Sequence, residues 1–236
     1  GSSLPVTRRL PAVDLPHGAP LSESVCVAYG GIDSYDIHAL ETAQCMSERR
    51  KGGEVGIRGV HALRGAKMWD LLARPEREAT RRLMVSALTR SHTLPVEGGY
   101  MTDRVTVDWA RKVFPEALAY FVEHLDGFRT TIFMTSIQDF NYAGLRSDTG
   151  EIVSCQMYLP MPTRGASTAD FFHPLVRHIE DVVITGKTPY PVERTLLTSG
   201  MTLAAVESLH RGQVLVETPE MKVRYEVGAE STFWRD

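Results

Sequence analysis

His173 to Tyr225 reads HPLVRHIEDVVITGKTPYPVERTLLTSGMTLAAVESLHRGQVLVETPEMKVRY and predicts two successive helices. The first helix is expected at 170–185, and Gly186 follows it, a residue type that favours the left-handed backbone at a helix C-terminus. The second helix is expected at 191–210, because a proline is well placed to open it and Gly212 ends it.

Outside these two helices, the sequence predicts mainly strands. They are expected at 25–29, 55–63, 119–125, 128–135, 140–146, 152–159 and 222–225, with helices at 36–51, 66–73 and 76–91 and an ordered loop with one helical turn at 92–112. Asp126-Gly127 fits the positive φ angles of a two-residue hairpin turn. Asp33 or Ser34 is expected to cap the helix at 36–51. This order is typical of an α+β fold, a large, mostly antiparallel β-sheet with helices packed on one face.

Two regions are expected along the chain. Residues 1–23 are rich in proline and polar residues, which indicates an extended N-terminal segment on the surface. Residues 24–236 are expected to form a single α+β domain, because a chain of 236 residues that is 43% hydrophobic can bury a sizeable core.

Composition argues against several classes of protein. The formal net charge is -3, whereas a nucleic-acid-binding protein is expected to carry a basic patch. The sequence contains no run of eighteen apolar residues, so no membrane span is predicted. The three cysteines lie far apart without CxxC spacing, so buried thiols in a reducing cytoplasm are expected rather than disulfides. The eight histidines show neither HxH nor HExxH spacing, so no metal site is expected.

Together with YGGIDSYDIHALE (Tyr29–Glu41), the segment His173–Tyr225 resembles the C-terminal domain of the Gfo/Idh/MocA oxidoreductases. The resemblance extends over roughly residues 24–65 and 115–225 and implies that domain's α+β fold. It also implies a homo-dimer or tetramer formed through the sheet face.

The resembled family normally carries a dinucleotide-binding Rossmann domain in front of this one. In this sequence, Gly52-Gly53-Glu54-Val55-Gly56 lacks the GxGxxG spacing and precedes a predicted strand rather than a helix. The Lys-Pro dipeptide that supplies the family's catalytic lysine is also missing. The resemblance therefore implies NAD or NADP in the complete enzyme, with none expected to bind this chain alone.

His38 is the candidate catalytic residue. The family has a Gly-rich strand end followed by D-x-x-x-H on a helix, and its histidine acts as acid/base on the sugar hydroxyl. Here Gly30-Gly31 precede the helix, and His38 opens a match to the family's H-A-L-D. Ser34 stands where the family has Asp, and Asp36 where it commonly has Gly. Without the resemblance, the residue alone favours the structural explanation, in which His38 caps or packs near the start of a helix.

The residues around His38 form a polar cluster suited to hydroxyl recognition. The predicted substrate-binding residues are Asp33, Ser34, Tyr35 and Asp36. Polar residues are also common in the first turn of any helix, so the pattern has a structural explanation as well.

The sequence thus leaves three functions open. The first is the substrate-binding and assembly portion of an NAD(P)-dependent oxidoreductase acting on a carbohydrate or polyol, inactive without a Rossmann domain. The second is a non-catalytic sugar-binding or dimerisation module. The third is a cofactor-free lyase or hydrolase that uses His38 with Asp36.

Overall fold

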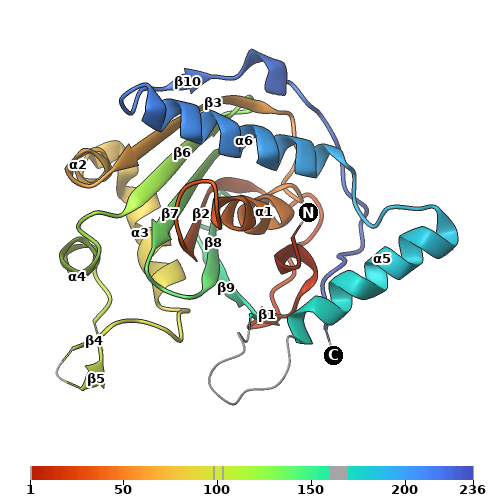
Figure 1. Cartoon of the computed structure of the whole chain (residues 1–236), viewed down its shortest axis with the longest axis horizontal. Coiled ribbons are helices and arrows are strands. Elements are labelled where there is room, and N and C mark those ends of the chain that lie inside the picture. The colour runs from red at the N-terminus through yellow and green to blue at the C-terminus, as the bar shows by residue number, and fades with distance from the viewer. Residues whose placement is uncertain (1, 98, 103, 160–169, 236) are drawn as a thin grey trace.

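The computed structural model describes residues 2–97, 99–102, 104–159 and 170–235, and an eight-stranded sheet forms its centre (Figure 1). The strand order is β1-β9-β8-β2-β7-β6-β3-β10. The strands are β1 (Arg9–Leu10), β2 (Leu21–Tyr29), β3 (Ile57–Arg64), β6 (Leu118–His124), β7 (Arg129–Thr135), β8 (Phe140–Arg146), β9 (Ile152–Met157) and β10 (Val216–Glu217), with a separate ribbon of β4 (Val96–Glu97) and β5 (Tyr100–Met101). The helices are α1 (Asp36–Ser47), α2 (Ala66–Leu72), α3 (Glu78–Leu88), α4 (Val107–Val113), α5 (His173–Thr185) and α6 (Glu193–His210).

The sheet is mostly antiparallel, which confirms the predicted α+β class. Within it, only the pair β2 and β7 runs parallel, with Cys26 opposite Ile132. Strands that follow one another in sequence, β6–β7 and β8–β9, pair as predicted.

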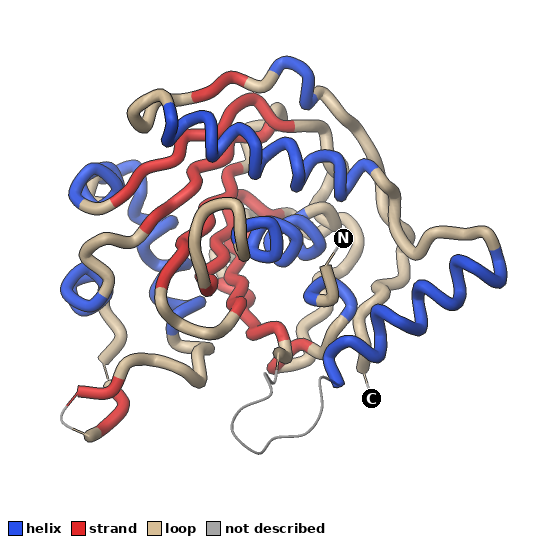
Figure 2. Tube along the Cα trace, viewed as in Figure 1, coloured by secondary structure: helices blue, strands red, loops and turns tan. Residues whose placement is uncertain are grey.

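Helices cover both faces of the sheet, whereas the sequence predicted helices on one face only (Figure 2). Successive side chains of a strand point to opposite faces. In β2, Cys26 and Ala28 therefore pack into the core beneath α1 and α6, while Val25 and Val27 pack with residues of α2, α3 and α4. The second face of the sheet is therefore covered by α2, α3 and α4. The dimer or tetramer through the sheet face stays a prediction.

The N-terminal segment was predicted to run along the surface. In the structure, part of it is buried in the core. Leu4 and Val6, in a short 3-10 turn, are 2% and 1% exposed. This turn packs against α1, and β1 then adds an edge strand to β9. The segment folds inward because its few apolar side chains cover α1.

Three local predictions are corrected. The last strand is β10, which pairs with β3, and the predicted strand at 222–225 contributes only the bridge between Tyr225 and Glu54. The β6–β7 hairpin has a longer turn, in which the Gly127 N–H donates to the His124 carbonyl and Gly127 alone has a positive φ, of 84°. The N-cap of α1 is Tyr35, without a side-chain cap.

The two C-terminal helices are confirmed with nearly the predicted bounds. Gly186 takes the left-handed conformation that ends α5 (φ 68°). The α6 helix packs on α1 and β3, whereas Pro174 is the only buried residue of α5, which extends away from the sheet (Figure 1). No helix in the described part of the chain has the length and apolar character needed to cross a membrane.

Candidate functional site

The predicted site residues lie in the turn that follows β2 (Asp33, Ser34 and Tyr35) and in the first turn of α1 (Asp36 and His38). Gly30 ends the strand with φ 103°, and a Cβ there would lie 2.7 Å from the Cβ of Tyr35. Only glycine therefore fits where the chain folds back over itself. Asp33 has φ 51°, a left-handed conformation that Asp tolerates better than most residues. Asp33, Ser34 and Tyr35 are exposed, and the Tyr35 side chain is 40% exposed.

Asp36 holds this turn together from the inside. Its side chain is fully buried and accepts hydrogen bonds from the backbone N–H groups of Asp33, Ser34 and Ile37 at 3.0–3.1 Å. Tyr120 of β6 donates its hydroxyl to the same carboxylate at 2.8 Å. The carboxylate predicted to contact substrate is therefore occupied by four internal donors.

His38 lies in the first turn of α1, half-buried among aromatic rings. Its Nδ1 is 2.8 Å from the Ser2 Oγ, and its ring centroid is 5.8 Å from that of Tyr35 and 6.2 Å from that of Phe140. Burial is the main cause that lowers the pKa of His38, opposed by the Asp36 carboxylate. The imidazole is therefore neutral at pH 7, and Nε2 has no hydrogen-bond partner within the described residues.

A hollow of about 350 Å³ with a mixed polar and apolar lining opens beside this turn, at the end of the sheet where β2, β3 and β7 finish. Gly30 and Gly31 line it, with Arg64, Glu116 and Ser136 opposite. Neither His38 nor any of residues 33–36 is among its lining residues. Sequence reasoning missed Arg64 and Glu116 because each lies far along the chain from the Gly-Gly signal.

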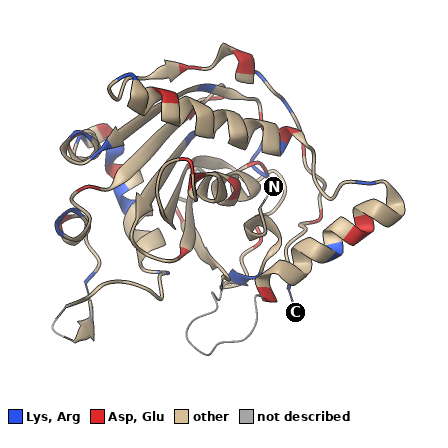
Figure 3. Cartoon of the chain, viewed as in Figure 1, with Lys and Arg blue, Asp and Glu red and all other residues tan. Residues whose placement is uncertain are grey.

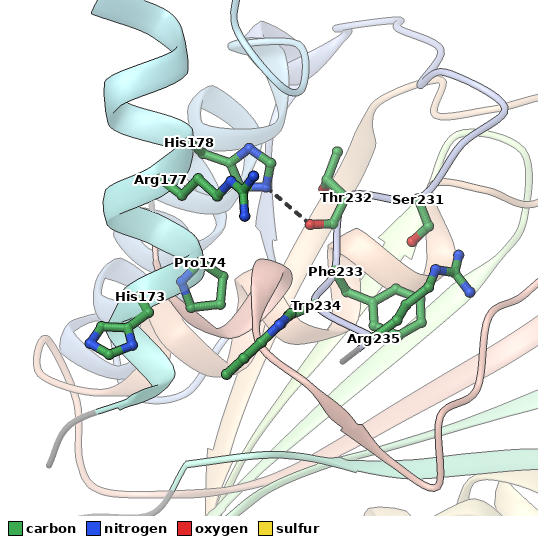
Figure 4. Close-up of a pocket in the computed structure, with 9 residues that line it drawn as sticks. All are labelled: His173, Pro174, Arg177, His178, Ser231, Thr232, Phe233, Trp234 and Arg235. Atoms are coloured by element: carbon green, nitrogen blue, oxygen red, sulfur yellow. Dashed lines mark hydrogen bonds between the residues drawn. The ribbon is translucent and has the colours of Figure 1, made fainter.

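A second, larger hollow of about 530 Å³ lies between α5 and the C-terminal segment, and Figure 4 draws the residues that line it. His173, Arg177 and Trp234 line it, and His178 Nε2 lies 3.1 Å from the Thr232 carbonyl. None of the predicted site residues reaches this hollow, which therefore stands apart from the turn around His38.

The strand–turn–helix at β2–α1 does not fit a dinucleotide. In dinucleotide-binding proteins, a turn of this kind holds the pyrophosphate through free backbone N–H groups and the positive end of the helix dipole. Here the N–H groups of Asp33, Ser34 and Ile37 already donate to the buried carboxylate of Asp36, and that carboxylate would also repel phosphate. Within the described residues, no group of three or more His, Cys, Asp or Glu side chains could hold a metal ion. All three cysteines are free and buried, as expected.

Comparison with known proteins gives only distant likeness. No protein-family model matches the chain, and no curated protein matches it. It is similar to a myo-inositol dehydrogenase from Corynebacterium glutamicum (12% identity, TM-score 0.45), covering 84% of this chain and 56% of that one. It is also similar to GenD2 from gentamicin A biosynthesis in complex with NAD (12% identity, TM-score 0.49, 86% of this chain and 56% of that one). A third likeness is to levoglucosan dehydrogenase in complex with NADH and levoglucosan (9% identity, TM-score 0.44, 86% and 60%).

The chain thus spans 56 to 60% of the length of these three solved structures. With TM-scores of 0.44 to 0.49, the likeness assigns neither a family nor an activity to the chain.

Proposed function

We propose that this chain is the substrate-binding and assembly portion of an NAD(P)-dependent oxidoreductase that acts on a carbohydrate or polyol. The proposal is supported by the resemblance of Tyr29–Glu41 and His173–Tyr225 to the C-terminal domain of the Gfo/Idh/MocA oxidoreductases. The nicotinamide belongs to another part of the complete enzyme, because the β2–α1 turn does not fit it.

The observation that carries the proposal is the environment of His38. The residue follows a Gly-Gly turn and is half-buried. Among the described residues, its ring has one hydrogen-bond partner, Ser2, at Nδ1. A neutral imidazole can accept the proton of a substrate hydroxyl at Nε2 and return it in the reverse reaction. Exposed Asp33, Ser34 and Tyr35 then contact neighbouring hydroxyls, and Asp36 keeps the turn in shape.

A titration of the chain with polyols tests substrate binding directly. The ring C–H signals of His38 are followed by NMR while myo-inositol and a panel of monosaccharides are added. We expect a bound polyol to shift these signals and the pKa of His38, and the signal is identified by its loss in His38→Gln. Invariant His38 signals across the whole panel would contradict the assignment.

Turnover tests the acid/base role. In the enzyme completed with a nicotinamide-binding domain, His38→Ala is expected to abolish turnover with little loss of stability. Because the base must be neutral, turnover should rise with pH through a pKa below the ordinary value of 6.5. Wild-type turnover in the alanine variant would exclude His38 as the catalytic group.

The alternative is a non-catalytic sugar-binding or dimerisation module. Ser34 favours this alternative, because the resembled family has an Asp at this position and its carboxylate is absent here. Calorimetric titration with polyols separates the two functions. Polyol binding without turnover in the completed enzyme supports a binding module. Self-association of the chain without any polyol binding supports an assembly module.

A further inference from the structure

The outer face of α6 is a continuous apolar stripe. Val192, Leu196 and Leu203 are 71%, 58% and 71% exposed. With Ser199 and Val206, both half-buried, they recur every three or four residues and therefore lie along one side of the helix. The opposite side, with Leu197, Met201 and Ala205, is buried against the sheet and α1.

This outer face also lacks charge. The segment TLLTSGMTLAAV, from Thr195 to Val206, contains no Asp, Glu, Lys or Arg. In Figure 3, the ribbon of α6 is coloured for charged residues only towards its two ends. A surface helix normally carries charged residues on its solvent side, so this face of α6 is composed like the inside of an interface.

The helix α5 extends the apolar surface. Val176, Ile179, Val183 and Ile184 are 49%, 53%, 79% and 80% exposed. A groove of about 420 Å³ joins the two helices, with Ile179 and Val183 on one side and Val192 on the other. We call these four residues, together with Val192, Leu196 and Leu203, the α5–α6 surface.

The size of this surface matches one side of a dimer interface. A fully buried Val, Leu or Ile side chain corresponds to roughly 60–120 Å² of apolar area, so seven side chains at these exposures offer about 300–550 Å². A standard interface buries about 800 Å² on each partner, of which roughly 450–500 Å² is apolar.

The stripe on α6 is also self-complementary. Ser199 stands at its middle, with Leu196 and Leu203 nearly equidistant on either side and Val192 and Val206 beyond them. In two antiparallel copies of α6 that cross at Ser199, each leucine therefore faces the other leucine of the partner. The small serine lets the helices approach closely at the two-fold axis, as an isologous interface requires.

We infer that the α5–α6 surface binds a second copy of this chain, with the two α6 helices packed antiparallel about Ser199. This interface lies on helices and not on the sheet face that the resemblance implied. It does not depend on the proposed activity.

Analytical ultracentrifugation of the whole chain tests the inference. The wild type is expected to be a dimer. Leu196→Glu with Leu203→Glu is expected to weaken self-association at least about 100-fold, because each charge would be buried in the interface. The control is Val96→Glu on the β4–β5 ribbon, where the exposed fraction of 58% equals that of Leu196, and it should leave the dimer intact. A single cooperative thermal unfolding transition in each variant checks that it folds, although the double glutamate variant should unfold at a lower temperature because it lacks the partner.

A disulfide tests the geometry. Ser199→Cys should cross-link two copies under mild oxidation, since the Cα atoms at the crossing point lie within disulfide reach. The native cysteines are buried and give little background. Ser86→Cys, a half-buried serine on α3 at the other face of the sheet, should not cross-link.

A wild-type monomer at high micromolar concentration would overturn the inference, and so would a dimer that survives both glutamates or a Ser199→Cys dimer that fails to cross-link. A monomer that instead binds a nicotinamide-binding domain through these residues would assign the surface to that domain.

Discussion

At the scale of single residues, two buried carboxylates of α1, those of Asp36 and Glu41, differ in how many hydrogen bonds they accept. Asp36 accepts four hydrogen bonds, whereas Glu41 receives one, from the Thr198 hydroxyl at 2.6 Å, and its Oε2 has no partner. Both are fully buried. The first therefore holds its surroundings in place, and the second costs stability when it ionises.

Asp36→Ala is expected to lower the free energy of unfolding by about 2–3 kcal/mol, because it leaves backbone N–H groups and the Tyr120 hydroxyl without their charged acceptor. The matched control is Ser34→Ala, two residues away and exposed, which should change stability little. Urea unfolding of both variants measures the difference. Equal stability of the two would show that the carboxylate does not hold the turn.

Glu41→Gln is expected to stabilise the chain at neutral pH. Burial raises the pKa of Glu41 above its ordinary value of 4.5, so the folded chain holds this proton more tightly than the unfolded chain does. Stability from this group is complete below the unfolded pKa and falls as the pH rises towards the folded pKa. The variant should therefore gain over the wild type above pH 4.5 and match it in acid, as measured by unfolding across pH. A gain that is the same at every pH would exclude ionisation as its cause.

At the scale of elements, buried ion pairs join α1 to its neighbours. Glu48, the C-cap residue of α1, accepts hydrogen bonds from Arg194 of α6 and, at 2.7 Å, from the Tyr225 hydroxyl. Arg194 also stacks on Tyr190, 4.0 Å from its ring centroid. Glu54, just beyond α1, is paired with Arg50 at 3.0 Å. The Glu48 contacts fix how α6 and Tyr225 are placed at the C-terminal end of α1.

Arg194→Met should cost about 3–5 kcal/mol of unfolding free energy, since it leaves the Glu48 carboxylate buried without its cation. The control is Arg211→Met, which breaks an exposed pair with Glu207 on the same helix and should cost at most about 1 kcal/mol. Adding Glu48→Gln to the first variant is expected to restore part of the loss. Losses that simply add in the double variant would show that the two groups are not coupled.

At the scale of the whole molecule, the sheet has a core on each side, and the N-terminal segment closes one of them. Leu4 is 2% exposed and belongs to the same cluster as Leu40 and Met46 of α1. The segment is therefore a structural part of the α+β fold.

Leu4→Ala is expected to destabilise the chain by about 2–5 kcal/mol through the cavity it leaves. Leu10→Ala, in the same segment but 37% exposed, is the control and should cost much less. Thermal or urea unfolding measures both. A negligible effect of Leu4→Ala would mean that the segment only rests on the surface in solution.

What the sequence predicted well was local. Gly186, Pro191 and Gly212 marked the last two helices, and Asp126-Gly127 marked the hairpin, because such residues act on the backbone directly. What it missed depends on distant contacts. Leu4-Pro5-Val6 has no periodic pattern, so its burial could not be predicted.

The candidate site divides in the same way. Gly30-Gly31 located the turn, and His38 lies there as expected. The hydrogen-bond partners of Asp36 and His38 could not be predicted from the sequence, because Tyr120 lies 84 residues from Asp36 and Ser2 lies 36 residues before His38. A motif of adjacent residues reveals a loop, whereas the partners that shape it become visible only in the fold.

The parallel pair β2–β7 also bears on how the chain is synthesised. Ser24 on β2 lies 106 residues before its partner Thr130 on β7, and the other neighbour, β8, begins later still at Phe140. As the chain leaves the ribosome, the central strand β2 therefore has neither neighbour to pair with until β7 has been made, 106 residues later for the pair Ser24 and Thr130. Pairing over such a separation is slow, so Val25 to Ala28 is the stretch that most needs shielding from other nascent chains.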